Sequence, residues 1–203
     1  MLETGDLLLF HGTGWISSIL EYIGQSKYSH VGIILKNPSF INPSLEDGLY
    51  VMHSSWSSTP DAEDHQQKFG VQIQLLSDVI AQYPDHSIYV RSVTVDRNDL
   101  FYTKLKEIHD TVHGKPYNLN LFDWIHAKEN LGDTYPLSIM WKHTERFWCS
   151  ALVSYMYYKL GWIRDLNWDL IAPREYSSKE STGQVIFTCV LSDEALLEKF
   201  LYE

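Results

Sequence analysis

Short apolar runs bounded by turn-forming residues dominate the first half of the chain and predict buried strands. Continuous apolar runs occupy residues 5–10, 29–36 and 49–56, and roughly four to eight residues is the usual length of a strand in a core. Apolar and polar residues alternate over 71–76, which predicts a half-buried strand. The run at 87–93 predicts one strand more.

Helical periodicity marks other parts of the chain. Residues 14–24 have apolar side chains three and four positions apart and end at a glycine, the pattern of a short amphipathic helix. A helix is predicted over 96–113, because a glycine and a nearby proline follow it, and another over 149–161. Near the C-terminus, 184–191 predicts a strand and 192–202 a helix with Ser192 as its N-cap.

Three segments have no such period. Residues 37–48 contain two Asn-Pro steps and predict a loop, and the polar residues 57–70 predict an exposed loop. Residues 117–146 are rich in aromatic side chains, and a segment of this length suits either a lid or cleft wall, or one or two short helices packed on the core. Without repeats or linkers, residues 1–203 are interpreted as a single α+β domain.

Composition and net charge argue against several classes of binding partner. The 203 residues have a net charge of -10, which argues against nucleic acid and against an anionic membrane surface as partners. A cationic or neutral substrate fits better. No stretch reaches the roughly 18 apolar residues of a membrane helix, and the first residues lack a basic, signal-like region, so a cytoplasmic location is expected. Two cysteines make no disulfide framework.

Cys149 lies in the apolar run "ERFWCSALVSYMYYKLG" and admits two interpretations. A free cysteine packs as a small hydrophobe, so it could simply fill the core. A nucleophilic thiol instead needs a base within hydrogen-bond reach and a third polar group that orients the base. His30 and His53 fall inside predicted strands, which hold side chains rigidly, although a histidine at a strand start is often only an edge residue.

A different pair of histidines suggests metal chemistry. His109 and His113 are four residues apart in "HDTVH", close to the zinc-protease pattern H-E-x-x-H, with Asp110 in place of the glutamate. No third ligand follows along the chain, so a solvated helix face is the favoured interpretation and no metal is predicted. Cys189 in "VIFTCVL" has few polar neighbours and is expected in the core.

Taken in order, several motifs resemble one family, the circularly permuted NlpC/P60 papain-like hydrolases. The similarity is to its YiiX/YaeF-type enzymes and their poxvirus relatives, with lecithin retinol acyltransferase-like proteins more distant. The motifs are "TGDLLLF", "YSHVGIIL", "LYVMHSS", "GKPYNLNLF", "FWCSALVSYMYYKLG" and "APREY", spanning about residues 4 to 178. The resemblance implies a permuted papain-like fold, with an antiparallel sheet or small barrel packed against helices.

The same resemblance implies catalytic roles at three positions. Cys149 matches the family nucleophile, His30 its general base, and His53 the third polar position, where many relatives have glutamate. Ala151 replaces a glutamate of the family motif. The resemblance also places Cys149 in the first turn of its helix, where the helix dipole and a nearby imidazolium would lower the pKa of the thiol.

Substrate contacts are implied for three further residues. Tyr117 matches a family aromatic whose hydroxyl would hold the substrate carbonyl, Trp148 ends the aromatic stretch that would shape the acyl site, and Ser150 lies in the turn that offers N–H groups to an oxyanion. The implied activity is hydrolysis of a peptide or lipid-linked amide through a thioester, without cofactor. Acyl transfer, or a non-catalytic binding module that retains the cleft, remain as alternatives, and the oligomeric state is open.

Overall fold

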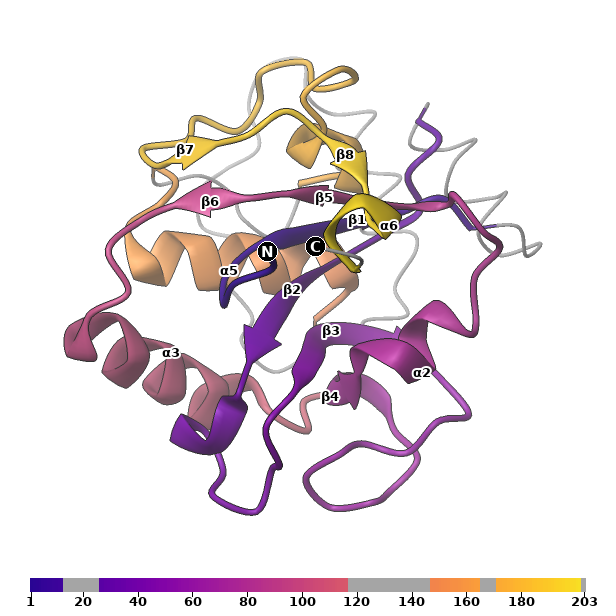
Figure 1. Cartoon of the computed structure of the whole chain (residues 1–203). Coiled ribbons are helices and arrows are strands. Elements are labelled where there is room, and N and C mark those ends of the chain that lie inside the picture. Colours follow the sequence, from indigo (N-terminus) through magenta and orange to yellow (C-terminus); the bar gives the residue numbers. More distant parts are fainter. Residues whose placement is uncertain (13–25, 117–146, 165–170, 202–203) are drawn as a thin grey trace, which may run out of the picture.

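The computed structural model describes residues 1–12, 26–116, 147–164 and 171–201. Its centre is an open antiparallel sheet with the strand order β4-β3-β2-β1-β5-β8 (Figure 1). The strands are β1 (Leu7–Phe10), β2 (His30–Lys36), β3 (Leu49–Trp56), β4 (Phe69–Leu75), β5 (Ile88–Arg91) and β8 (Ala195–Leu196). The predicted α+β class is therefore confirmed, in its open-sheet form and not as a barrel.

Helices cover both faces of this sheet (Figure 1). The helices are α2 (Leu76–Ile80), α3 (Asp99–Val112), α5 (Cys149–Leu160) and α6 (Glu198–Leu201), with 3-10 turns at η1 (Pro38–Phe40) and η3 (Pro173–Tyr176). A separate two-stranded ribbon joins β6 (Val93–Thr94) to β7 (Val190–Leu191).

Alternation along the strands divides the core into two clusters. Side chains such as Val31 and Ile33 of β2 pack in one cluster with α3 and α5. Their neighbour Ile34 points the other way and packs with Leu76 and Val79 of α2. The sheet is therefore a middle layer with apolar side chains on both faces, because successive residues of a strand point to opposite sides.

Helix α5 is the most deeply buried helix of the described chain. Every residue from Cys149 to Tyr157 is buried, and the helix packs on β2, β3 and α3. An apolar helix without a polar face suits such a position. It ends where the sequence predicts, at Gly161, whose φ of 79° closes the helix in the left-handed conformation.

Two sequence predictions about the other elements need correction. Helix α3 begins at Asp99 and not at 96, since the Asn98 side chain caps it by accepting a hydrogen bond from the Phe101 N–H at 3.1 Å. Strand β4 is buried from Gly70 to Gln74 and not half buried, because its polar residues Gln72 and Gln74 are both 0% exposed. The predicted helix at 14–24 lies outside the described residues.

The C-terminal predictions are largely wrong. The strand predicted over 184–191 shrinks to β7, and α6 is much shorter than the predicted helix over 192–202. Ser192 is not a helix cap, because its Oγ accepts the N–H of Ser92 at 2.9 Å. Glu194 is held inside by hydroxyl groups of distant residues, Tyr28 at 2.8 Å and Ser177 at 2.6 Å. These long-range bonds override the local helical pattern.

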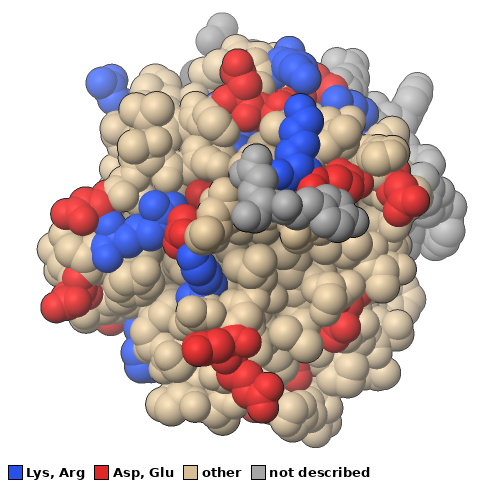
Figure 2. All heavy atoms as spheres, in the orientation of Figure 1, with Lys and Arg blue, Asp and Glu red and all other residues tan. Residues whose placement is uncertain are grey.

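Charged side chains of both signs are interspersed over the face in Figure 2. Several form ion pairs, such as Lys36 Nζ with Glu3 Oε1 at 2.7 Å. Among the described residues, no helix combines the length and the apolar character that crossing a bilayer requires.

Two leucines of α3 provide a test of this packing. Leu105 is 0% exposed and Leu100 is 61% exposed. We expect Leu105→Ala to lower the free energy of unfolding by about 2–5 kcal/mol, because it leaves a cavity in the core. The same substitution at Leu100 is expected to change it by less than about 0.5 kcal/mol. Urea denaturation measures both, and equal losses would contradict the packing of α3 described here.

Candidate functional site

Two of the predicted catalytic residues are hydrogen-bonded to each other. His30 is the first residue of β2 and His53 lies within the neighbouring β3, and His30 Nε2 is 3.0 Å from His53 Nδ1. Gly32 gives room for this pair, because a Cβ there would lie only 3.1 Å from the Cβ of His53 and 3.0 Å from Val51 Cγ1. The two imidazole rings meet edge-on, with centroids 5.1 Å apart.

Gln74 of β4 fixes the orientation and tautomer of this pair. Its Nε2 donates to the carbonyl oxygen of Thr59 at 2.5 Å, so its Oε1 must face His53 Nε2, 3.1 Å away. An amide oxygen only accepts, so we assign the proton of His53 to Nε2 and its lone pair to Nδ1. His30 then donates from Nε2, which leaves its Nδ1 unprotonated and able to accept a proton.

Cys149 is the first residue of α5, and its side chain lies at the N-terminal end of the helix. Ser54 of β3 holds the preceding turn by donating from Oγ to the carbonyl oxygen of Phe147 at 2.5 Å. The Cys149 sulfur accepts hydrogen bonds from backbone N–H groups of Val31, Ser150 and Cys149 itself. The nucleophile candidate therefore contacts the residue directly after His30.

The end of the β2–β3 ladder explains this contact. Strand β2 pairs with β3 over Ile33–Lys36, so Val31 lies beyond the paired residues. Its N–H bonds to the cysteine sulfur. Helix α5 packs on the face of the sheet that carries Val31, whereas His30 points to the other face. The side chains of Cys149 and His30 therefore lie on opposite faces of the sheet, and Val31 connects them at the point where the ladder stops.

Burial is the largest cause of the pKa shifts of Cys149, His53 and His30. It raises the pKa of Cys149 to about 11, although the three backbone N–H groups act in the opposite direction. It lowers the pKa of His53 to about 4, and it lowers that of His30 well below its usual value, with the neighbouring His53 adding to the effect. The expectation of a lowered thiol pKa is therefore wrong for this conformation, because desolvation outweighs the helix dipole.

Tyr83 is a residue of this region that the sequence analysis missed. Its ring is 4.8 Å from that of Phe10, and Phe10 in turn is 5.1 Å from His30. Burial raises the pKa of the Tyr83 hydroxyl, and the charge of a Cys149 thiolate would raise it further. Tyr83 therefore lies in the same electrostatic neighbourhood as the thiol. It follows α2 and belongs to no apolar run or motif, so local pattern gave no signal for it.

The three predicted substrate-binding residues differ in where they lie relative to the described structure. Tyr117 lies outside the described residues. Trp148 occupies the N-cap position of α5, and its indole Nε1 is buried and has no hydrogen-bond partner among the described residues. Ser150 is 2% exposed, and its N–H lies at the Cys149 sulfur. A buried donor without a partner is uncommon in folded proteins, and this one belongs to the residue that precedes Cys149.

The sequence pattern favoured a solvated helix face for His109 and His113. The structure contradicts this interpretation. His109 is 4% exposed, and both His109 and His113 contact the carboxylate of Glu63. Burial alone would lower the pKa of His113, but the carboxylates of Asp61 and Glu63 outweigh it and raise the value to about 9. Asp61 is fully buried, so the loop at 57–70 is only partly exposed. Cys189, expected in the core, is half-buried at its margin.

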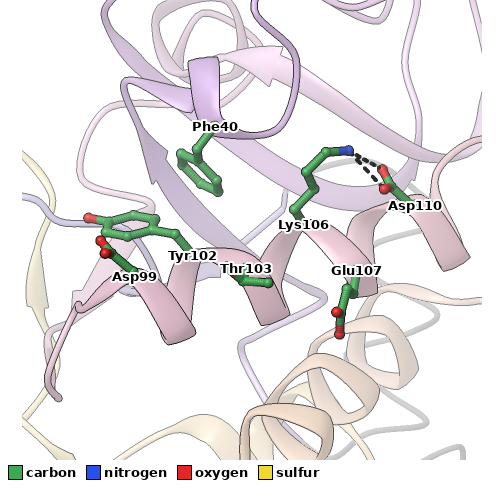
Figure 3. Close-up of a pocket in the computed structure, with 7 residues that line it drawn as sticks. All are labelled: Phe40, Asp99, Tyr102, Thr103, Lys106, Glu107 and Asp110. Atoms are coloured by element: carbon green, nitrogen blue, oxygen red, sulfur yellow. Dashed lines mark hydrogen bonds and ion pairs between the residues drawn. The ribbon is translucent and has the colours of Figure 1, made fainter.

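The outer side of α3 carries a concave surface that is separate from these residues (Figure 3). It is lined by Phe40, Asp99, Tyr102, Thr103, Lys106, Glu107 and Asp110. Its polar groups include an ion pair between Lys106 and Asp110, with Nζ–Oδ2 at 2.8 Å. Neither Cys149 nor His30 borders it, so it is not part of the candidate catalytic site.

Comparison with known proteins supports the fold and not the chemistry. The chain is similar to a crystal structure described as metalloprotein yiiX from Escherichia coli O157:H7, DUF1105, with a TM-score of 0.54 and 16% sequence identity. The superposition covers 96% of this chain and 98% of that one. No family model and no curated protein matches the sequence. The YiiX-like architecture expected from the motifs is thus confirmed at the level of fold.

Alkylation kinetics test the electrostatics of Cys149. In a Cys189→Ser background, we expect the rate of iodoacetamide alkylation to keep rising above about pH 9, because burial favours the neutral thiol, whose ordinary pKa is about 8.5. His30→Ala should change the rate at pH 7 little, since the His30 imidazole is already neutral. A rate that levels off below pH 8 and needs His30 would instead reveal a thiolate–imidazolium pair and contradict this description.

Proposed function

We propose that the protein is a cysteine hydrolase that cleaves an acyl amide or ester through a thioester on Cys149. The observation that carries the proposal is the hydrogen-bonded series Gln74–His53–His30, which ends one residue from the N–H that contacts the Cys149 sulfur. A nucleophile, a base and a group that orients the base are the three parts that such chemistry needs. The YiiX-like fold is consistent with this activity.

The reaction begins with attack of the Cys149 sulfur on the substrate carbonyl carbon. The thiol proton passes to His30 Nδ1, and the carbonyl oxygen becomes an oxyanion. The C–N or C–O bond to the leaving group then breaks, and His30 returns the proton to the departing amine or alcohol. Water, deprotonated by His30, attacks the thioester, and the free acid and the thiol are released.

Backbone and indole donors are suited to the oxyanion. The N–H groups of Cys149 and Ser150 lie at the start of α5, where the positive end of the helix dipole favours negative charge. The unpaired indole N–H of Trp148 is a third donor in the same turn. In this mechanism His53 accepts a hydrogen bond from His30 but has no negative charge, so it stabilises an imidazolium less than a carboxylate would.

Burial of the site favours acyl transfer as a second candidate activity. Cys149 and His53 are each 4% exposed. Water reaches such a thioester poorly, so an alcohol or amine acceptor could compete with hydrolysis. Product analysis after adding a small amine or alcohol separates the two outcomes. In either case the substrate has an acyl amide or ester bond, and a peptide or lipid-linked amide is the class that the resemblance implies.

Substitution of the nucleophile and the base tests the proposal. With a set of acyl 4-nitrophenyl esters and acyl amides, we expect a burst of product equal to one equivalent of Cys149 in the wild type. Cys149→Ala should abolish the burst, and His30→Ala should lower kcat/KM by about 10²- to 10⁴-fold, the usual contribution of a general base.

Cys189→Ala is the matched control and should leave the burst unchanged, because Cys189 lies at the core margin. Mass spectrometry should find the acyl group on Cys149. If every substrate leaves Cys149 unmodified in folded protein, the fold carries a binding module and the proposal fails.

Gln74 is expected to act as a positioning residue. Gln74→Leu removes the acceptor of the His53 proton, so kcat should fall while KM changes little, because the orientation of His30 is lost. Gln74→Glu keeps an acceptor and adds a negative charge, so it should retain activity and move the acidic limb of the kcat pH profile to higher pH. Equal loss in both variants, with an unmoved pH profile, would indicate a purely structural role.

A further inference from the structure

Two histidines and a glutamate converge on one point where α3 meets the loop after β3. His109 and His113 are one turn apart, and their rings are stacked with centroids 4.7 Å apart and planes 24° apart. Both Nε2 atoms face the same oxygen, Glu63 Oε2, at 2.8 and 2.9 Å. All three atoms lie within 4.8 Å of one another. Such convergence is the geometry of a ligand set around a single ion.

The glutamate is held in place by the loop and is not a free surface side chain. Its Oε1 accepts a hydrogen bond from Asn42 Nδ2 at 3.3 Å, and its N–H bonds to Asp61 Oδ1 at 2.8 Å. The side chains of Glu63 and His109 are 7% and 6% exposed. The N–H of the intervening Ala62 bonds to Ile73 of β4 at 2.7 Å. The donor atoms are therefore preorganised.

Two further carboxylates contact these three groups. His109 Nδ1 is 3.1 Å from Asp110 Oδ1, and Lys106 donates to both oxygens of that carboxylate (Figure 3). Metal-binding histidines commonly donate their second ring N–H to a carboxylate in this way, which leaves Nε2 free to bind the metal. Asp61 Oδ2, 3.0 Å from His113 Nε2, supplies a fourth donor atom.

We propose that Glu63, His109 and His113 bind a divalent transition metal, zinc above all, with Asp61 as fourth ligand. Imidazole nitrogens with carboxylate oxygens are a ligand set that zinc prefers, in tetrahedral geometry. Zinc–ligand bonds of about 2.0–2.1 Å place tetrahedral ligands about 3.3–3.4 Å apart. The contacts of 2.8 and 2.9 Å need to open by only about 0.5 Å. Two carboxylates also neutralise the charge of the ion.

Lys68 competes for the same place. Its Nζ is 2.8 Å from Asp61 Oδ2 and 3.1 Å from His113 Nε2, so an ammonium group already occupies the region of negative potential. The same Nζ is 2.7 Å from Asp64, whose side chain is 44% exposed. A metal ion can displace the ammonium toward this outer carboxylate without leaving it unpaired.

This site differs from the zinc-protease pattern that the sequence suggested. Asp110 contacts the Nδ1 side of His109 and so supports a ligand, whereas a protease would use that residue to activate water. The metal would join the C-terminal end of α3 to the loop that connects β3 and β4. Metal binding here does not require the proposed hydrolase activity.

Metal titration tests the site directly. In chelator-treated protein with both cysteines replaced by serine, we expect one Zn²⁺ per chain by calorimetry, a rise in Tm, and a visible Co²⁺ absorption spectrum typical of tetrahedral coordination. Glu63→Gln and His109→Ala should weaken binding by more than the about 10- to 100-fold that loss of an outer-shell partner costs. His65→Asn, in the same loop but exposed, is the matched control and should bind as the parent does.

Lys68→Met tests the metal site even if the variants of its ligands unfold. It removes the competing ammonium and leaves all four ligands, so Zn²⁺ affinity should rise. Circular dichroism checks the fold of each variant. Failure of the folded parent to bind Zn²⁺ or Co²⁺, or binding that is unchanged in folded Glu63→Gln, would overturn the proposal and leave an ordinary histidine–carboxylate cluster.

Discussion

The burial of α5 against the sheet and α3 is the constraint on which the rest of the structure depends. A mostly apolar helix has little polar surface to turn toward water, so α5 enters the core from Cys149 to Tyr157 and only its last turn reaches the surface. Its first turn then meets the sheet at Val31, where the pairing of β2 with β3 has stopped. The position of Cys149 follows from this packing, and so does the dryness of its surroundings.

Exclusion of water from this region determines the protonation states of the candidate site. The Cys149 thiol and the imidazoles of His30 and His53 are neutral, because the free-energy cost of burying a charge exceeds the stabilisation that the helix dipole and the backbone N–H groups provide. A neutral, hydrogen-bonded series keeps the tautomers ordered without an ion pair. In the proposed mechanism charge then develops only when a substrate carbonyl is present to accept it, where preorganised donors are most effective.

The loop between β3 and β4 connects the two proposed sites. Thr59 of this loop accepts the hydrogen bond that orients Gln74, and Glu63 of the same loop faces His109 and His113. Asp61 contributes to both regions, since its charge acts on His53 as well as on His113. A bound metal would therefore stiffen the segment that fixes the histidine tautomers. Similarity to the yiiX structure shows the architecture, whereas function has to be argued from these side chains.

Local pattern by itself determined much of the framework. The apolar runs located β1, β2 and β3, the glycine at 161 located the end of α5, and the order of the motifs selected Cys149, His30 and His53 as candidates. These predictions succeed because strand length, helix period and turn chemistry depend on neighbours in the chain.

Only the tertiary structure decided which polar groups face one another. The glutamines of β4 look like a solvent-facing row, yet Gln74 is fully buried against His53. Glu63 contacts His109 and His113, which lie several elements later in the chain. Glu194 lies in a segment predicted to be helical, yet it forms a hydrogen bond with Tyr28. The pKa of Cys149 was likewise set by desolvation. Burial and long-range hydrogen bonds arise from distant segments, so no local pattern contains them.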